Sequence, residues 1–380
     1  MRWSILISIF LINELGASDI DGPSIVRVTQ SIGHTEEPHW DPRKNILYFV
    51  NIHAGEVYAY HYFSKILRKI TLNGSTSPVI PSRHNPNLLL VGVNRSIVAL
   101  EWDAKNKLGD KAVLTTVSNK YPKSRFNDGK ADKNGNLWWG TIGREENLVV
   151  APNEAYLFKI TKNNIKQPSV AIAPVTNSNG LAWNKANDKF YYIDTPTRKV
   201  VEYTYFNENS SISSTSRTAF DLNDYNTTIT GLPDGMTIDD QDYLYIALYG
   251  GGSVIKVDPK TGKLLMIIAI PARDVTSVMF GGPGLDILFV TTSKVSLTSK
   301  EQLQSPGAGS VFAVKNLNAK GLPAFTADIV NSVPSRNILE NIFNQDLFPK
   351  ESTNQNYVQA PGDSQSGLWE SIMKVFRGFF

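Results

Sequence analysis

Residues 124–141 read SRFNDGKADKNGNLWWGT. In this stretch Arg125, Asn127 and Asp128 come directly before Gly129, and a polar turn and two tryptophans follow. A short strand, a turn rich in Asn, Asp and Gly, and a second apolar strand form the pattern of a β-hairpin. A strand end needs only a turn, so the crowding of polar side chains beside a glycine indicates a site shared with other parts of the chain.

The same arrangement recurs along the sequence. Six units, each with a short strand start, a polar turn and an aromatic or aliphatic strand, centre on Pro38, Val79, Gly129, Gly180, Gly235 and Ser277. They follow one another at steps of 41, 50, 51, 55 and 42 residues, and each continues into a second hairpin, as in 56–70 and 253–270. Four short strands in each such unit are typical of a β-propeller blade. The sequence therefore predicts an all-β fold, a six-bladed β-propeller with a C-terminal tail.

Ring closure sets the expected domain bounds. An open ring would leave unpaired strand edges, so we expect the strand at 24–30 to complete the blade that ends at 309–316. The propeller would then span 20–318. The extension at 319–380 begins with a segment rich in Asn, Pro, Ser and Gln, and its last residues, 366–380, carry apolar side chains at helical spacing. This short amphipathic helix would pack on the propeller or contact a membrane surface or a protein partner.

The first residues predict export. Residues 1–18 contain an arginine, an apolar run and then small residues, which is the pattern of a signal peptide, so we expect a secreted protein. The chain has no cysteine, which excludes thiol catalysis and a cysteine-based zinc site. Its formal charge of +3 gives no basic footprint for nucleic acid. We expect a monomer, glycosylated at four sequons: Asn73, Asn94, Asn209 and Asn226.

Oxygen-bearing side chains begin four of the six blades. In a propeller, the first residues of the innermost strands surround one mouth of a central channel. The residues at this position are Glu36 and Glu37, Asn127 and Asp128, Asn179, and Asp234. Carboxylate and amide oxygens suit a hard divalent cation such as Ca²⁺, Mg²⁺ or Mn²⁺, and Zn²⁺ also accepts them. Asn-Gly and Asp-Gly are also common turn dipeptides, but their register with the repeat favours one shared metal site.

Five motifs carry a family resemblance: EEPHW (36–40), RFNDGKAD (125–132), NSNGLAW (177–183), LPDGMTID (232–239) and VDPKTGK (257–263). Over about 30–316 they resemble the SMP-30/regucalcin, gluconolactonase and luciferin-regenerating enzyme family. The resemblance implies a six-bladed propeller with one divalent metal ion in its channel and hydrolysis of sugar lactones. It also implies the metal ligands Glu36, Asn179 and Asp234, with Arg125, Asn127 and Glu145 binding the substrate.

This resemblance and the residue chemistry together predict a metal-dependent lactonase. The cation would polarise the lactone carbonyl, and Asp234 would act as the general base toward the attacking water. Arg125 would hold the ring oxygens through its planar guanidinium. Asp128 would support the site from beside it.

Three positions depart from the family pattern and leave the lactone unidentified. Thr35 replaces a common glycine, Asn51 replaces a frequent aspartate, and Gly250 replaces a usual asparagine. Two other hypotheses for the function stay open. One is a secreted divalent-cation or ligand-binding propeller with little hydrolase activity. The other is a paraoxonase-like esterase with a histidine base, because His34 and His39 flank Glu36.

Overall fold

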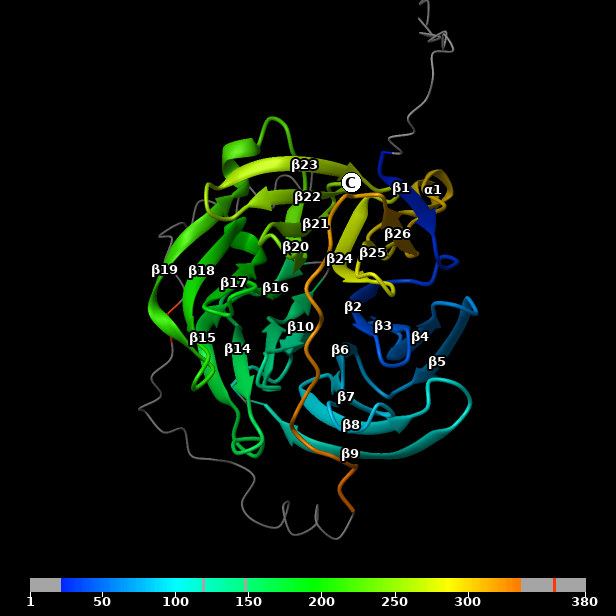
Figure 1. Cartoon of the computed structure of the whole chain (residues 1–380), viewed down its shortest axis with the longest axis vertical. Helices are drawn as coiled ribbons and strands as arrows, with labels where there is room; N and C mark the ends of the chain where they lie inside the picture. The colour runs from blue at the N-terminus through cyan, green and yellow to red at the C-terminus, as the bar shows by residue number, and fades with distance from the viewer. Residues whose placement is uncertain (1–21, 118–119, 147–148, 336–357, 360–380) are drawn as a thin grey trace, which may run out of the picture.

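The computed structural model describes residues 22–117, 120–146, 149–335 and 358–359. Six sheets stand around a central axis, as Figure 1 shows; each has four antiparallel strands, and one of them carries a fifth, parallel strand at its edge. This is the predicted six-bladed β-propeller.

Each blade is described from its innermost strand outward. Blade 1 contains β2 (Thr35–Asp41), β3 (Ile46–Asn51), β4 (Glu56–His61) and β5 (Ile66–Thr71). Blade 2 contains β6 (Thr76–Pro81), β7 (Leu88–Val93), β8 (Ser96–Trp102) and β9 (Leu108–Thr116). Blade 3 contains β10 (Arg125–Ala131), β11 (Leu137–Ile142), β14 (Ala155–Ile160) and β15 (Ser169–Val175).

The second half of the ring repeats this order. Blade 4 contains β16 (Ser178–Trp183), β17 (Lys189–Asp194), β18 (Lys199–Phe206) and β19 (Ser211–Asp221). Blade 5 contains β20 (Leu232–Ile238), β21 (Leu244–Tyr249), β22 (Ser253–Asp258) and β23 (Lys263–Ala269). Blade 6 contains β24 (Asp274–Gly281), β25 (Ile287–Ser293), β26 (Val311–Lys315) and β1 (Ser24–Arg27).

Short elements join or extend the blades. The hairpin β12 (Glu145–Glu146) and β13 (Val149–Val150) is inserted into blade 3, and β27 (Val358–Gln359) runs parallel to β15. Helix α1 (Ser299–Gln304) and the two 3₁₀ turns η1 (Thr195–Thr197) and η2 (Leu222–Tyr225) are the helical elements of the described residues.

The ring closes through its two ends. Strand β1 pairs with β26, with Ser24 opposite Lys315 and Arg27 opposite Phe312, so the N-terminal strand forms the outer edge of blade 6. This confirms the predicted pairing of 24–30 with 309–316. Between blades, side chains of the inner strands and their neighbours make the core. Trp138 of β11, for example, meets Trp183 of β16 edge to face at 6.1 Å.

Every innermost strand has a register break near its start. These β-bulges lie between Glu36/His39, Thr76/Val79, Phe126/Gly129, Asn179/Leu181, Pro233/Met236 and Val275/Ser277. A bulge re-aims side chains and bends the strand, so successive residues such as Asn127 and Asp128 can both serve the channel. In β10, β16 and β20 a glycine lies at the bulge, because the inner strands approach closely there. A Cβ on Gly180 would lie 2.6 Å from Cβ of Met236 and 2.8 Å from the carbonyl oxygen of Asp234.

The C-terminal extension crosses one face of the ring. Residues 319–330, which we call the strap, run from blades 5 and 6 to blades 2 and 3, and appear as the orange trace over the centre of Figure 1. The strap is fixed by backbone hydrogen bonds: Leu322 donates to Ile238, Ala327 donates to Pro81, and Asp328 donates to Gly135. Within the extension, Ala327 and Ile329 are buried in the core between blades 2 and 3.

The remaining parts of the predicted organisation are not described. The signal peptide at 1–18 and the amphipathic helix at 366–380 lie outside the described residues. In the ranges that the structure does describe, no helix has the length and apolar character needed to cross a membrane.

Candidate active site

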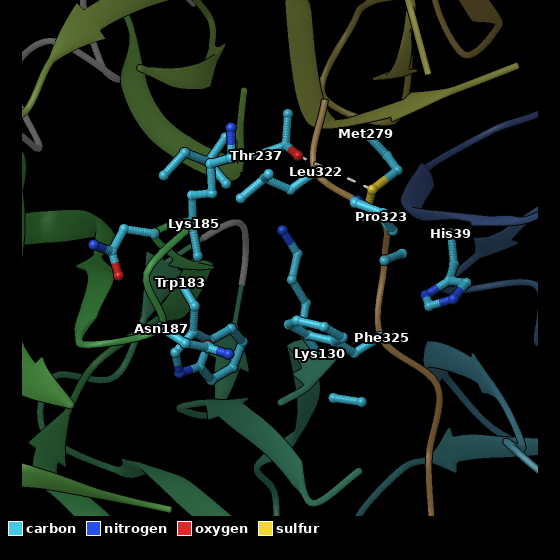
Figure 2. A pocket seen from close by; sticks show the side chains of 15 residues that line it. His39, Lys130, Trp183, Lys185, Asn187, Thr237, Met279, Leu322, Pro323 and Phe325 are labelled. Carbon is cyan, nitrogen blue, oxygen red and sulfur yellow. Dashed lines mark hydrogen bonds between the residues drawn. The ribbon is translucent and has the colours of Figure 1, made fainter. Parts of the chain in front are cut away.

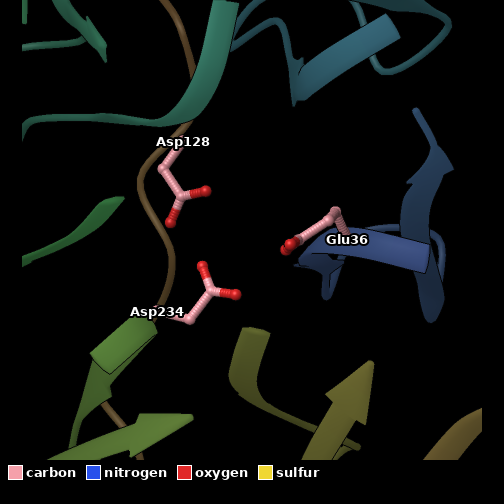
Figure 3. Close-up of side chains that lie close together, drawn as sticks. All are labelled: Glu36, Asp128 and Asp234. Atoms are coloured by element: carbon pink, nitrogen blue, oxygen red, sulfur yellow. The ribbon is translucent and has the colours of Figure 1, made fainter. Parts of the chain in front are cut away.

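Three carboxylates from three blades converge at one end of the channel. Glu36 of β2, Asp128 of β10 and Asp234 of β20 each place an oxygen within 4.8 Å of the others, and Figure 3 shows the three side chains facing one another. All three are buried. We call this group the acidic cluster, and the channel end that holds it the near mouth.

Burial and mutual repulsion make these acids hard to ionise together. Burial, with Asp234 and Asp128 nearby, raises the pKa of Glu36 well above its ordinary value. The pKa of Asp234 is also raised well above its ordinary value by burial and by Asp128 and Glu37. For Asp128, burial raises the pKa to about 7. Crowded carboxyl groups keep protons unless a positive charge balances them.

A divalent cation fits this donor set. The Oε2 atom of Glu36 is buried without a hydrogen-bond partner, and a buried anionic oxygen needs a partner or a metal. The Asp234 carboxylate accepts no hydrogen bond from the described residues, so it is also available. Three hard oxygen donors without nitrogen or sulfur match the preference of Ca²⁺, Mg²⁺ or Mn²⁺.

Asn179 lies beside the acidic cluster and is linked to it by Asn127. The Nδ2 atom of Asn127 donates to Oδ1 of Asn179 at 2.8 Å, and Asn179 itself donates to Oγ1 of Thr195 at 2.6 Å. Asn127 also lies 3.5 Å from Oδ1 of Asp128. The geometry therefore brings Glu36, Asp128 and Asp234 together and places Asn179 one hydrogen-bonded side chain away from them. The role of Asn179 as a metal ligand stays a prediction.

The predicted substrate residues stand at the same mouth. Arg125 is buried and faces Glu145 of the inserted hairpin, with 2.7 Å between Nε and Oε2 and 3.1 Å between Nη2 and Oε1. Its Nη1 donates to Oδ1 of Asn127 and to the carbonyl of Phe126. These contacts use four of the five guanidinium N–H groups. One donor therefore remains for a ligand oxygen without breaking the network.

The two histidines that flank Glu36 in sequence separate in space. His34 lies at the near mouth, where Nε2 is 3.8 Å from Oε1 of Glu36 and Nδ1 is 2.8 Å from Oγ of Ser293. Its ring is 5.1 Å from that of His53. His39 follows Glu36 by three residues in β2 and therefore lies toward the opposite end of the channel. Only His34 is therefore placed to serve as the alternative base.

Sequence reasoning gave too little weight to two acids. Asp128 was expected only to support the site, although it belongs to the acidic cluster, and Glu37 received no role. Glu37 has φ of 49°, is buried, and accepts a hydrogen bond from the backbone N–H of Gly129 at 2.9 Å. A pair of consecutive polar residues is the sequence signal for both acids: Asp128 follows Asn127, and Glu37 follows Glu36. Both pairs lie at a bulge, where neighbouring side chains need not point to opposite faces.

The four predicted glycosylation sites lie on the outer surface. Asn73, Asn94, Asn209 and Asn226 are all exposed, so their side chains are accessible for modification. Glycosylation itself stays a prediction.

Comparison with known proteins matches most of the ring. Residues 34–294 match the family described as the SMP-30/Gluconolactonase/LRE-like region. Regucalcin from Bos taurus is 32% identical over 291 residues, which cover 76% of this chain and 93% of that protein. A solved structure of luciferin-regenerating enzyme is 31% identical, covers 80% of this chain and 99% of its own, and superimposes with a TM-score of 0.75.

A more distant structure agrees in fold. The calcium-binding protein regucalcin from Agrobacterium tumefaciens is 20% identical, has a TM-score of 0.69, and covers 79% of this chain and 95% of its own. Together, the matched region, the relatives and the ring of six blades give one conclusion: this chain belongs to the SMP-30/gluconolactonase/luciferin-regenerating enzyme-like family.

Proposed function

We propose that this protein is a secreted, metal-dependent lactone hydrolase. The observation that carries the proposal is the acidic cluster of Glu36, Asp128 and Asp234, which lies within the same mouth as the Arg125–Glu145 pair. A cation site beside a fixed guanidinium is suited to a neutral, oxygen-rich ring. The family description includes gluconolactonase, which supports a sugar lactone as the substrate class.

Glu36, Asp234 and Asn179, with Asp128 beside them, would hold one divalent ion, either Ca²⁺, Zn²⁺, Mn²⁺ or Mg²⁺. When bound, such an ion polarises a carbonyl and makes water more acidic.

Asp234 is the proposed general base. Its carboxylate accepts no hydrogen bond from the described residues and stands in the cluster, so an attacking water can donate to it. A base must lie within hydrogen-bond reach of the proton that it removes. The proton passes to Asp234, the water oxygen adds to the lactone carbonyl carbon, and the ring C–O bond then breaks. The resulting alkoxide takes up a proton to give the hydroxy acid.

Arg125, Asn127 and Glu145 would position the lactone. The guanidinium is held on two sides by Glu145 and Asn127, so it offers its remaining N–H in a fixed direction. A donor that is already oriented loses little freedom when the substrate binds. Glu145, at the edge of the mouth, can accept from a substrate hydroxyl.

Hydrolysis of aldonolactones by the secreted protein tests this proposal. Proton release is followed after chelation and after return of each cation, for the wild type, Asp234→Asn and His34→Gln. We expect one or more cations to restore turnover in the wild type and Asp234→Asn to lose about 10²–10⁴-fold in kcat. His34→Gln should retain most activity.

Two results would change the assignment. Loss of turnover in His34→Gln with retention in Asp234→Asn would favour the esterase with a histidine base. A folded, cation-loaded wild type that hydrolyses no lactone would favour a binding propeller.

A further inference from the structure

A ligand that meets the acidic cluster lies at the near mouth. The strap crosses the opposite end of the channel, which we call the far mouth, and a cavity of about 200 Å³ lies beneath it. Figure 2 shows this cavity, with Lys130 between Trp183 on one side and Phe325 of the strap on the other. None of the described residues that line it carries a carboxylate, so the cation-binding groups belong to the near mouth.

The turn of residues 52–55 forms the rim of blade 1 at the near mouth. It joins β3 to β4, and β3 ends beside the start of β2, where the acidic cluster begins. The turn carries the exposed side chain of His53. Backbone hydrogen bonds hold the turn on two sides, because Ile52 donates to His34 and Thr76 donates to Ile52. His53 is therefore presented from a fixed backbone.

His34 supports the ring of His53. The two rings lie 5.1 Å apart, with an angle of 35° between their planes. His34 is itself fixed: its backbone N–H donates to Oδ1 of Asn51, and its Nδ1 lies 2.8 Å from Oγ of Ser293. Its Nε2 is 3.8 Å from Oε1 of Glu36. His53 is therefore one ring away from the acidic cluster.

The ring nitrogens of His53 are available to a ligand. The ring forms no hydrogen bond with any described residue, and its ring contact is with His34. Partial burial and the guanidinium of Arg125 lower the pKa of His53, while Glu145 acts in the opposite direction. The ring is therefore neutral near pH 7, with one nitrogen as a donor and the other as an acceptor. A hydroxyl group, which also donates and accepts, suits such a ring.

We propose that His53 is a substrate-binding residue that recognises ring hydroxyl groups of the lactone, an inference that rests on the proposed hydrolase. The imidazole exchanges a hydrogen bond with a hydroxyl on the blade 1 side, while Arg125 and Glu145 hold the lactone from blade 3. A site that pairs with a substrate hydroxyl discriminates against the analogue that lacks it. The near mouth therefore prefers a hydroxylated lactone to the same ring without hydroxyl groups.

Binding of two inert lactams tests this role separately from turnover. Gluconolactam is the amide analogue of a sugar lactone, and δ-valerolactam is the same ring without hydroxyl groups. Ligand-observed NMR titrations in saturating Ca²⁺ give the ratio of the two dissociation constants for the full-length wild type, His53→Phe and His53→Gln. Phenylalanine keeps a ring over His34 and removes both nitrogens, whereas glutamine keeps a donor and an acceptor. His84→Phe is the control, because His84 lies at the far mouth, with Nε2 3.3 Å from Oδ1 of Asp328 in the strap.

We expect the wild type and His84→Phe to prefer gluconolactam, and His53→Phe to lose about five- to tenfold of this preference, the effect of one hydrogen bond. His53→Gln should stay within about threefold of the wild type. A wild type without preference, an undiminished preference in His53→Phe, or an equal loss in His53→Gln or His84→Phe would each overturn the proposal.

Hydrolysis of gluconolactone by the same proteins is measured in parallel. A chain that binds gluconolactam through His53 but hydrolyses no lactone would retain this inference and contradict the proposed hydrolase. A chain that hydrolyses gluconolactone with its preference intact in His53→Phe would retain the hydrolase and contradict this inference.

Discussion

Arg125 and Glu145 form a two-point ion pair at the near mouth, with Nε 2.7 Å from Oε2 and Nη2 3.1 Å from Oε1. The pair joins the innermost strand of blade 3 to the hairpin inserted in the same blade. Its arginine is buried while its glutamate is partly exposed, so the guanidinium is held in the channel wall and Glu145 faces the entrance.

The first prediction concerns this pair. Glu145→Gln removes the charge that orients Arg125, so we expect KM to rise about tenfold while kcat changes little, because ground-state and transition-state binding weaken together. Steady-state kinetics on the best aldonolactone measure both constants. Glu146→Gln on the same hairpin is the control. An equal rise in KM for both variants would show that substrate binding depends on the hairpin as a whole and not on the ion pair.

The second prediction separates the cation ligands from their support. Asp128→Asn removes one of three converging charges, so we expect cation affinity to fall about 10–100-fold, as is typical for groups that surround a metal site. Asn179→Ala should weaken binding by a comparable or larger factor. Calorimetric titration of the metal-free protein measures both. Asp110→Asn, at an exposed position of β9, should bind as the wild type does, and unchanged affinity in Asp128→Asn would remove that residue from the site.

The third prediction concerns pH and the metal-free protein. Asp128 has a pKa of about 7 in the folded state, against about 4 for an aspartate in an unfolded chain. Between these values the folded state binds a proton that the unfolded chain has released, so this group's contribution to stability falls as pH rises. His34 and His39, with lowered pKa values, act in the opposite direction below about pH 6.5.

A comparison with Asp128→Asn removes this carboxyl group, together with its effect on the pKa values of Glu36 and Asp234, and keeps both histidines. In chelator, the Tm of the wild type should drop relative to that of Asp128→Asn as pH rises from about 4 to 7. A saturating cation should reverse this trend. If the Tm values of the two metal-free proteins changed in parallel with pH, the raised pKa of Asp128 would be contradicted.

The fourth prediction concerns the strap. Ile329 is 2% exposed in the core between blades 2 and 3, so Ile329→Ala should lower the free energy of unfolding by about 2–5 kcal/mol. Ile66→Ala, on an exposed outer strand, should change it by less than about 0.5 kcal/mol. Chemical denaturation measures both. Activity per folded molecule should stay unchanged in both variants, because the strap lies at the far mouth.

Truncation extends this test. A chain that ends after residue 318 lacks the strap, so it should melt earlier than one that ends after 335, yet keep its turnover when folded. Loss of turnover in a folded chain ending after 318 would show that the extension contributes to the near mouth.

The fifth prediction concerns export. With its own leader, the protein should enter the medium of eukaryotic cells without residues 1–18 and with glycans on some of its four exposed sequons. Intact-mass analysis before and after enzymatic deglycosylation measures both changes. Asn→Gln substitution at all four sites is the control, and a retained leader with no mass shift would contradict secretion.

Local patterns in the sequence are enough to predict the ring and the residue types of the site. Strand and turn signals repeat with each blade, and oxygen donors mark the start of β2, β10, β16 and β20, with glycine after them in the last three. These are local patterns, because hairpin formation depends on neighbouring residues. The closure of the ring by 24–30 was also predictable, because the blade that ends at 309–316 would otherwise have an unpaired strand edge.

Which donors meet, and where the strap lies, follows from contacts between segments that are distant in sequence. Asp128 joins Glu36 and Asp234 because a bulge in β10 turns two consecutive residues toward the channel, and strict alternation along a strand does not predict this. The strap belongs to a segment rich in Asn, Pro, Ser and Gln, and this composition predicts a loop or a tail. Its order comes from hydrogen bonds to strand ends that are distant in sequence, such as those of Ala327 with Pro81 and of Leu322 with Ile238, and no local pattern encodes such contacts.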